Sequence, residues 1–350
     1  MPTLNATKKP LSEQVMVITG ASSGIGLVTA RMAARKGAAV LLAARNESDL
    51  DEGVECIQRL GGRATWIKAD VADPEQVERI ADEAMREFGR IDTWVNNAAV
   101  SLYGKLTDLK VEDMRRLADV TFWGTVYGSL AAVERMRAAG GTIINVASVL
   151  ADRAVPLQGI YSAMKHAVRA FSDTLRMELE LDDVPVSVSV IKPGSMDTPL
   201  FEKAKTYLDE EPQPIPPVYA PEAVAETILA CARHPRREVT VGGISGLLSV
   251  GQHVSPRVTD KYLQRYGVTR QLSGKPVEPD RRDNLHHPVP HDGGERGRNW
   301  DGRVLKRSLY TRSQLNPGTT ALTLAGLGVA MMLGSRVLGR RNGYVVELDE

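Results

Sequence analysis

The chain has 350 residues, which is enough for one large α/β domain with an extension or for two domains. Its formal net charge of +1 at pH 7 excludes a bulk electrostatic attraction for nucleic acid, and its 43% hydrophobic and 25% charged residues are typical of an ordinary globular protein. The only cysteines, Cys56 and Cys231, exclude a disulfide framework and fit a reducing compartment.

A polar stretch without a secretory signal pattern, residues 1–13, predicts a loose arm ahead of the first domain. From Val15 the pattern is an apolar strand, a glycine-rich turn and a helix, and the glycines are Gly20, Gly24 and Gly26. Gly20 permits a tight turn, and the other two permit close approach of a phosphate and close packing of the helix. Because a helix N-terminus favours anions, this stretch predicts a pyrophosphate-binding turn.

The second predicted strand runs from about Ala38 to Ala43 and is followed by Ala44 and Arg45. Dinucleotide-binding folds that prefer NAD usually place an acidic residue here to hold the ribose 2′-hydroxyl. A guanidinium can instead pair with a 2′-phosphate, whereas the alternative is a solvent-exposed arginine at the start of a loop. We therefore expect NADP rather than NAD as the cofactor.

Strands and helices then alternate along the chain. Helices are expected at Glu47–Leu60, Pro74–Phe88, Val111–Ala138, from before Tyr161 to about Leu181, and at Ala220–Arg233. The remaining strands are expected at Ala64–Asp70, Ile91–Ala99, Thr142–Ala147, from Val184 onward, and at Glu238–Val241. Seven strands in about 245 residues, separated by helices, predict a doubly wound Rossmann-type parallel sheet with helices on both faces.

A possible acid–base group lies between residues 141 and 165. Ser148 follows a predicted strand, at the sheet edge that faces ligands in such folds, and Tyr161 and Lys165 share one helical face. We expect Lys165 to lower the pKa of Tyr161, and Ser148 to hydrogen-bond a substrate oxygen. A tyrosine and a lysine four residues apart are common in helices and do not by themselves indicate catalysis. The glycine-rich turn earlier in the chain supports a catalytic role for this pair.

Taken together, these motifs resemble the short-chain dehydrogenase/reductase family. They are Thr19-Gly20-x-x-x-Gly24-Ile25-Gly26, Asn96-Asn97-Ala98, Ser148, Tyr161-x-x-x-Lys165 and Pro193-Gly194, spread over about Val15 to Gly243. The resemblance implies that Tyr161 is the general acid/base, that Ser148 polarises the carbonyl and that Lys165 holds the nicotinamide ribose. It also implies a cofactor site made of Gly20, Ser22, Ser23, Gly24, Ile25, Gly26, Arg45, Asp70, Val71, Asn97, Ala98, Tyr161, Lys165, Pro193, Gly194 and Thr198.

Two positions depart from the family pattern. Ala99 stands where glycine is usual, and Thr121 stands where many members carry an asparagine that completes a proton relay to the lysine. Thr121 is therefore a candidate catalytic position whose relay is in doubt, because threonine is shorter and has one hydroxyl. A water in a new position could restore the relay.

Beyond a domain at 14–245, the sequence divides into an irregular extension at 246–316, a helix at 317–338 and a polar tail at 339–350. The extension has little periodicity apart from a short helix near Val258–Tyr266. Its run His286-His287-Pro-Val-Pro-His291 indicates a solvated loop rather than a metal site, and no metal is expected. Its basic part, 294–312, predicts an arm on the domain or on a neighbouring subunit, with a headgroup-binding segment as the alternative.

The stretch Gly318–Ser335 is 18 residues without a charge, about 27 Å long as a helix. Small residues four apart, such as Gly326 and Ala330, are typical of packed membrane helices. A membrane-embedded helix is expected here, and a buried or interface helix is the alternative. The catalytic domain is expected in the cytoplasm, with membrane association through this helix.

These observations predict an NADP-dependent oxidoreductase that passes hydride between the nicotinamide and a carbonyl or secondary alcohol. One alternative is an NADP-binding scaffold or sensor with little turnover, and another is use of NAD or a related reaction such as epimerisation. The substrate-shaping loops are expected at 100–106, 149–159 and 196–219, whose apolar residues hint at a lipophilic carbonyl or alcohol. A homo-oligomer is also expected, joined through the long helices.

Overall fold

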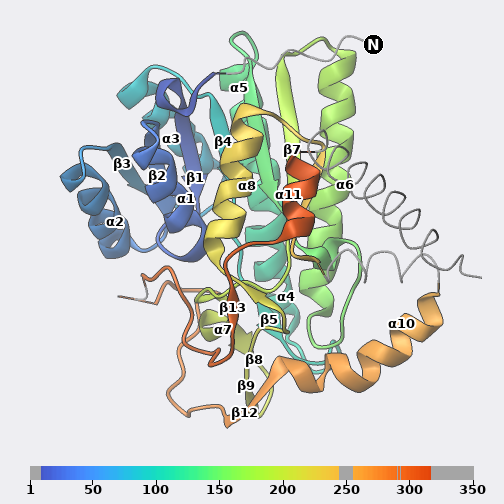
Figure 1. The fold of residues 1–350 in the computed structure, drawn as a ribbon. Coiled ribbons are helices and arrows are strands. Elements are labelled where there is room, and N and C mark those ends of the chain that lie inside the picture. Colours follow the sequence, from blue (N-terminus) through green and yellow to red (C-terminus); the bar gives the residue numbers. More distant parts are fainter. Residues whose placement is uncertain (1–8, 244–254, 290, 292, 317–350) are drawn as a thin grey trace, which may run out of the picture.

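The structure is a computed structural model that describes residues 9–243, 255–289, 291 and 293–316. Its centre is a seven-stranded sheet in the order β11-β7-β6-β4-β1-β2-β3, and all neighbouring strands are parallel (Figure 1). The strands are β1 (Val15–Thr19), β2 (Ala39–Ala44), β3 (Arg63–Lys68), β4 (Thr93–Asn96), β6 (Gly141–Val146), β7 (Val186–Pro193) and β11 (Glu238–Val241). The predicted doubly wound parallel sheet is confirmed.

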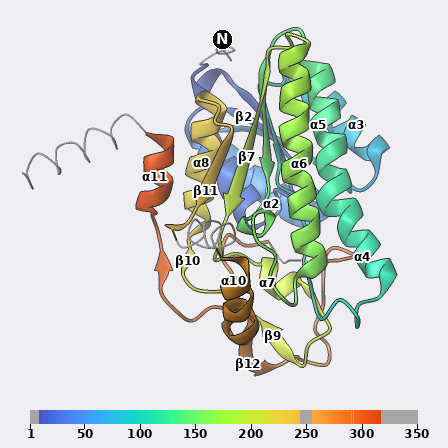
Figure 2. The ribbon, with the colours of Figure 1, turned by 90° about the vertical axis from the view of Figure 1, so that its right-hand side faces the viewer.

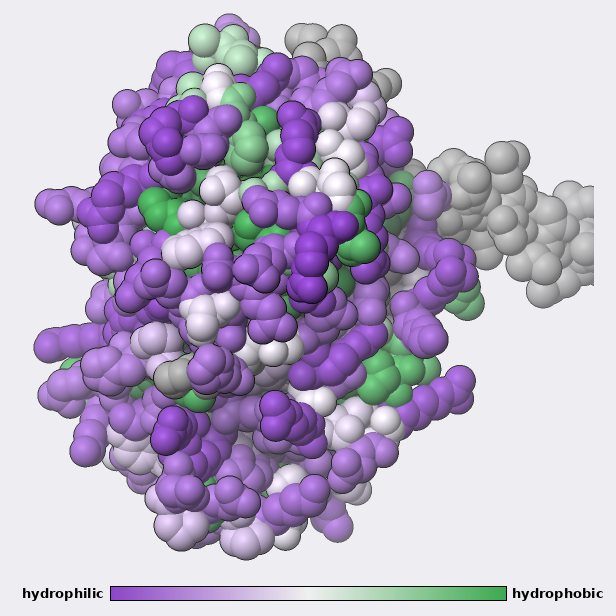
Figure 3. All heavy atoms as spheres, turned by 90° about the vertical axis from the view of Figure 1, so that its left-hand side faces the viewer, coloured by the Kyte–Doolittle hydropathy of each residue, from purple (hydrophilic) through white to green (hydrophobic). Residues whose placement is uncertain are grey.

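Helices cover both faces of this sheet, with α1, α2 and α8 on one face and α3, α5 and α6 on the other (Figures 1 and 2). The helices are α1 (Gly24–Arg35), α2 (Glu47–Arg59), α3 (Pro74–Phe88), α4 (Val111–Ala118), α5 (Gly124–Met136), α6 (Gly159–Leu181), α7 (Leu200–Lys203), α8 (Pro221–Arg233), α10 (Pro256–Tyr262) and α11 (Leu309–Leu315). Every residue of β1 and β2 is buried, as expected for strands enclosed on both faces. The side of the molecule at the β3 edge presents mostly hydrophilic side chains (Figure 3).

Local signals in the sequence place the ends of α3. The Asp73 carboxylate accepts the backbone N–H groups of Glu75 and Gln76, and Pro74 occupies the first turn. Gly89 ends the helix with a φ of 73°, a left-handed conformation that glycine adopts without steric cost. The predicted bounds of this helix are therefore correct.

The single helix predicted over 111–138 differs in detail. It consists of α4 and α5 joined by a π-helical turn at Asp119–Trp123. A π turn inserts one extra residue into the helical ladder and frequently occurs at functional sites. Thr121, the departure from the family pattern, lies inside this turn and is fully buried.

The extension returns to the domain as a folded arm. Short strands pair β5 (Leu102–Tyr103) with β8 (Lys205–Thr206), β9 (Glu210–Pro212) with β12 (Leu272–Pro276), and β10 (Val218–Tyr219) with β13 (Val304–Leu305). The predicted short helix is present as α10, followed by a π-helical turn at Leu263–Gly267. The extension thus contains short strands and helices, and Val304–Leu305 of its basic part pairs with β10.

Three predicted segments fall largely or wholly outside the described residues. They are the N-terminal arm, of which residues 1–8 are not described, the helix at 317–338 with its uncharged stretch Gly318–Ser335, and the polar tail at 339–350. Within the part of the chain that the structure describes, none of the helices combines the length and the apolarity that crossing a membrane would need.

The strand order identifies the edge of the sheet at which a ligand is expected to bind. The chain leaves β1 toward β2 on one side, whereas β4 lies on the other side of β1. In open parallel sheets, ligands bind beyond the carboxyl ends of the strands at such a reversal. The turns after β1 and β4 therefore form the centre of the candidate site.

Candidate active site

The glycine turn after β1 is tightly packed. Gly20 has a φ of 65°, and a Cβ on Gly26 would lie 2.3 Å from the Gly20 carbonyl oxygen, so only glycine fits at Gly26. The Asn97 side chain, from the turn after β4, donates to the carbonyls of Thr19 at 3.0 Å and Gly20 at 3.2 Å. Asn97 therefore ties the two turns together at the point where the strand order reverses.

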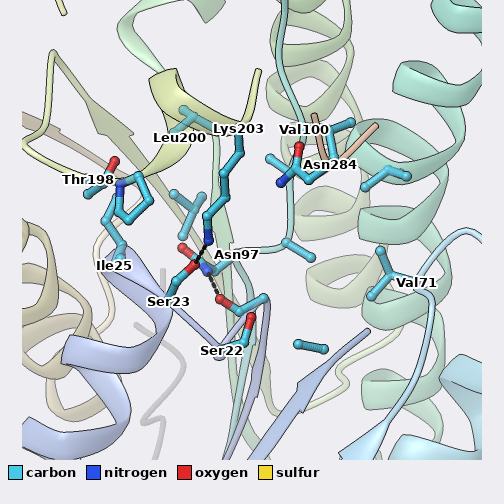
Figure 4. Close-up of a pocket in the computed structure, with 18 of the residues that line it drawn as sticks. Ser22, Ser23, Ile25, Val71, Asn97, Val100, Thr198, Leu200, Lys203 and Asn284 are labelled. Carbon is cyan, nitrogen blue, oxygen red and sulfur yellow. Dashed lines mark hydrogen bonds between the residues drawn. The ribbon is translucent and has the colours of Figure 1, made fainter. Parts of the chain in front are cut away.

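A groove runs along this edge of the sheet and collects most of the predicted site. The predicted residues that line it are Gly20, Ser22, Ser23, Gly24, Ile25, Arg45, Asp70, Val71, Asn97, Ala98, Ser148, Tyr161, Lys165, Pro193, Gly194 and Thr198. Figure 4 shows Ser22, Ser23 and Ile25 on one side of the groove. Two predicted residues are not in the lining: Gly26, which packs beneath the turn, and Thr121.

Ser148, Tyr161 and Lys165 meet at one end of the groove. The Lys165 ammonium donates to the Val146 carbonyl at 2.8 Å and lies 5.6 Å from the centre of the Tyr161 ring. Ser148 follows β6 and caps the 3₁₀ turn at Val149–Ala151, where its Oγ accepts the Leu150 backbone N–H at 3.1 Å. All three side chains are buried, so charge developing among them is poorly screened by water.

Burial controls the protonation of this group. Desolvation raises the pKa of Tyr161 well above 10.0, and a hydrogen bond from Ser148 offsets only part of that rise. Desolvation also lowers the pKa of Lys165 from 10.5 to about 7. We expected Lys165 to lower the pKa of Tyr161, but in this structure the pKa of Tyr161 is raised, because burial disfavours the phenolate more strongly than the neighbouring groups favour it.

Thr121 is not among the residues that line the groove. Its carbonyl accepts from the Thr125 hydroxyl at 3.0 Å, while its own buried Oγ1 has no hydrogen-bond partner among the described residues. Leaving a buried hydroxyl unpaired costs ~1–3 kcal/mol. A water or a ligand group that reached Oγ1 would therefore bind there favourably.

The two polar residues expected to recognise the adenosine already have protein partners. Arg45 donates to the carbonyls of Leu285 and His286, each at 3.3 Å, and Arg116 is ion-paired with Asp70. Arg116 also donates to the Leu285 carbonyl at 3.0 Å. Arg45 and Asp70 thus both line the groove. Arg45 contacts the extension directly and Asp70 is linked to it through Arg116, and the sequence indicated neither contact.

Sequence reasoning missed several residues of the groove. Lys203, from α7, is buried and its ammonium donates to the Ser23 hydroxyl at 3.0 Å (Figure 4). Asn284 and Pro288 of the extension also line the groove. No motif marks these positions, and only a buried lysine near an anion-binding turn could have suggested Lys203.

A second pocket opens beside Ser148 and Tyr161, which line both cavities. The three predicted loops contribute to it, through residues such as Tyr103, Val155 and Phe201. The extension adds a wall that was not predicted, formed by Tyr262, Leu263, Tyr266, Gly267 and Arg270. The pocket is mainly aromatic and aliphatic, so it favours an apolar ligand.

A buried polar chain holds one wall of this pocket. The Gln158 amide donates to the Tyr103 hydroxyl at 2.6 Å and to the Gln271 amide oxygen at 2.9 Å. Gln271 in turn donates to the Gly267 carbonyl at 2.7 Å. These bonds fasten the turn after α10 to the catalytic end of the domain.

The histidine run of the extension has a structural contact. The His286 ring is bonded to the Asp113 carboxylate at 2.7 Å. Among the residues that the structure describes, no group of three or more histidine, cysteine, aspartate or glutamate side chains is arranged to hold a metal ion.

Comparison with known proteins decides the family. Residues 14–208 match the model of the short chain dehydrogenase family. The chain belongs to that family. This short-chain dehydrogenase is 45% identical over 326 residues to the uncharacterized oxidoreductase YxnA of Bacillus subtilis, a similarity that covers 91% of this chain and 90% of YxnA. Because less than a tenth of this chain is left uncovered, the similarity includes most of the extension.

Solved structures support the same assignment. An alcohol dehydrogenase from the archaeon Thermococcus sibiricus, complexed with 5-hydroxy-NADP, is 27% identical to this short-chain dehydrogenase with a TM-score of 0.58, over 65% of this chain and 95% of that one. A short-chain dehydrogenase from Streptomyces avermitilis is 27% identical with a TM-score of 0.61, over 73% and 98% of the two chains. The protein is therefore an oxidoreductase of a family that uses a nicotinamide cofactor and a small-molecule substrate.

Proposed function

We propose that this short-chain dehydrogenase is an NADP(H)-dependent enzyme that interconverts a carbonyl compound and its secondary alcohol. The observation that carries the proposal is the meeting of Ser148, Tyr161 and Lys165 at the junction of two cavities. One cavity has the glycine turn that suits a dinucleotide, and the other is apolar and suits a substrate.

The residues of the groove fit a dinucleotide phosphate. The turn at Ser22 and Ser23 precedes the N-terminus of α1, which favours anions. Arg45 stands at the end of β2, where a guanidinium suits a 2′-phosphate, and the buried ammonium of Lys203 lies beside Ser23. These positive groups support NADP over NAD. The archaeal structure with a bound NADP analogue supports the same choice by analogy.

The proton chemistry follows from the catalytic end of the groove. Bound NADPH would supply the hydride. Tyr161 keeps its proton at neutral pH because burial raises its pKa, so it can donate that proton to the substrate oxygen. Ser148 accepts from the Leu150 N–H and hydrogen-bonds the phenol oxygen of Tyr161, so its proton would turn from that oxygen to the substrate carbonyl and polarise it. Lys165 is held near the ring, where its ammonium stabilises negative charge on the phenol oxygen as the proton leaves.

Tyr161→Phe tests this assignment directly. The change removes the transferable proton but keeps the ring, so we expect turnover to fall by a factor of about 100 or more, the usual contribution of general acid–base catalysis. NADPH affinity should stay within a few-fold of wild type. The measurement is a steady-state assay at the nicotinamide absorbance band with a panel of carbonyl compounds, and retained turnover would show that another group moves the proton.

A cofactor-binding sensor with little turnover is the second candidate. The observation in its favour is the buried Thr121 hydroxyl, which has no partner among the described residues and so interrupts the protein part of the relay. Tight NADPH binding with no reaction on any carbonyl or alcohol of the panel would favour this candidate. A Thr121→Asn variant that gains turnover would then place the defect at the relay.

Five further proposals come from the sequence. They are a lipophilic substrate, a homo-oligomer joined through the long helices, a cytoplasmic catalytic domain, membrane contact through 318–335 and the division of the chain at residues 14, 246, 317 and 339. The apolar second pocket supports the lipophilic substrate. Strands β12 and β13 of the extension pair with β9 and β10 of the 14–245 region.

A further inference from the structure

The described residues of the extension between 284 and 298 lie across the adenosine half of the groove. On the side of β2 and α2, their carbonyls accept from Arg45, and the Val289 carbonyl accepts from the Asn46 amide at 2.9 Å. On the side of α1, Glu295 is ion-paired with Arg31 at 2.7 Å. In Figure 1 this part of the chain, drawn in orange and red, passes below α1 and α2.

The same segment is fastened to the opposite wall. The Asn284 backbone N–H donates to the Lys203 carbonyl at 2.9 Å, and His286 is bonded to Asp113. Farther along, Arg296 is ion-paired with Glu222 at 2.5 Å, and the Gly297 N–H donates to Asp197 at 3.2 Å. The segment therefore bridges the groove, and we call its described residues, 284–289, 291 and 293–298, the strap.

One side chain of the strap faces the groove with an unmet hydrogen bond. Asn284 lines the groove together with Asp70, Val71 and Lys203. Its Oδ1 is buried and has no hydrogen-bond partner among the described residues. Figure 4 shows Asn284 on the same side as Lys203, across the groove from Ser22 and Ser23. Both backbone groups of Asn284 are bonded, so its side chain is held in this place.

A buried amide oxygen without a donor is costly, and a ligand that supplies the donor recovers that cost. The adenosine half of a dinucleotide offers such donors in its 6-amino group and its ribose hydroxyls. We propose that the strap completes the cofactor site, that Asn284 accepts a hydrogen bond from this half of NADP(H), and that the cofactor enters and leaves when the strap lifts. This inference rests on the proposed function.

The strap's backbone already occupies positions that suit the cofactor's phosphates. The Gly24 N–H, at the N-terminus of α1, donates to the Gly294 carbonyl at 2.7 Å, and Arg45 donates to carbonyls of 284–286. These donors are the ones that we assign to the pyrophosphate and the 2′-phosphate. Cofactor entry must therefore break some of these bonds. The bonds that hold the strap in place then limit the rates of cofactor association and release.

The first test concerns affinity. Asn284→Leu keeps the size of the side chain but removes the acceptor, so we expect the Kd for NADPH to rise about tenfold, mainly through faster release. The measurement is stopped-flow NADPH fluorescence, with a chase of excess NADP⁺ for the release rate. An unchanged Kd in a variant with wild-type circular dichroism would overturn the role of Asn284.

The second test concerns exchange. A double variant, Glu295→Gln with Arg296→Gln, breaks the anchors to Arg31 and Glu222 but removes no residue that we assign to cofactor binding. We expect the association and release rates to rise together, each about fivefold, with little change in Kd. The matched control is Glu83→Gln, which breaks an ion pair with Arg86 on the surface of α3 and should leave both rates unchanged.

The outcomes separate this inference from the proposed function. Absence of NADPH binding by the wild-type protein would overturn both. Tight NADPH binding by the wild type, with an unchanged Kd in Asn284→Leu and unchanged rates in the double variant, would overturn the inference and leave the proposed function in place. Equal changes in the double variant and the control would also overturn the role of the strap.

Discussion

At the scale of single residues, the site combines buried polar groups whose protonation is set by desolvation. Tyr161 keeps its proton at neutral pH because burial raises its pKa, and burial lowers the pKa of Lys165 to about 7, so that both protonation states of the amine are populated near neutral pH. The polar residues of the adenosine end differ, because Arg45 and Asp70 each have a bonded partner. Chemistry and recognition are thus placed at opposite ends of one groove.

Lys165 predicts a pH dependence of stability. Its pKa is about 7 in the folded state against 10.5 ordinarily, so between these values the unfolded chain binds more protons and stability rises with pH. Below about pH 7 both states are charged and the full penalty is present. We expect the free energy of unfolding of wild type to rise relative to Lys165→Met from pH 7 to 9.5, measured by urea denaturation without cofactor. A constant difference would contradict the lowered pKa.

Arg45→Ala tests the choice of cofactor. Loss of a guanidinium that pairs with the 2′-phosphate should weaken NADPH binding about tenfold or more, since a hydrogen bond to a charged group contributes ~1.5–3 kcal/mol. NADH lacks that phosphate, so its Kd should change little. Fluorescence titration of both cofactors makes the comparison, and equal losses would show that Arg45 acts through the strap instead.

At the scale of elements, capping residues in the sequence predict where a helix begins and ends, whereas the sequence pattern does not predict an irregular turn inside a helix. Asp73 caps α3 as its position in the sequence predicted, because a cap needs only residues within the same turn. The π turn at Asp119–Trp123 was not predicted, because it interrupts a pattern that reads as one continuous helix. Its position beside the catalytic end is known only from the fold.

The cap of α3 gives a prediction at this scale. Asp73→Ala removes the acceptor for two backbone N–H groups, so the free energy of unfolding should fall by ~0.5–2 kcal/mol. Cofactor affinity should stay unchanged, because Asp73 is not among the groove residues. Chemical denaturation followed by circular dichroism measures the loss. Full stability in the variant would mean that packing alone sets the start of α3.

At the scale of the whole molecule, the extension and the domain share their hydrogen bonds. The Thr240 carbonyl, in β11, accepts from both Thr311 and Gln314 of α11. The strap is bonded to α1, α7 and α8. A ligand in the groove would therefore contact elements from nearly the full described length of the chain. Cofactor binding and global stability should be coupled for this reason.

This coupling predicts a thermal shift. NADPH at 100 times its Kd should raise the free energy of unfolding by ~2.7 kcal/mol, because it binds the folded state only. The expected result is a rise in melting temperature that grows with the logarithm of NADPH concentration, measured by differential scanning calorimetry. NADH at the same concentration should give a smaller shift, and equal shifts would argue against NADP specificity.

The sequence by itself determined the parallel sheet, its seven strands, the glycine turn and the membership of Tyr161, Lys165 and Ser148 in one site. Those features depend on short-range patterns: apolar runs, glycines at fixed spacing and side chains on one helical face. Only the tertiary structure decided the partners of Arg45, the places of Lys203 and Asn284 in the groove, and the pKa directions of Tyr161 and Lys165. These depend on contacts between segments far apart in the chain and on the water that such contacts exclude, and no local pattern encodes either one.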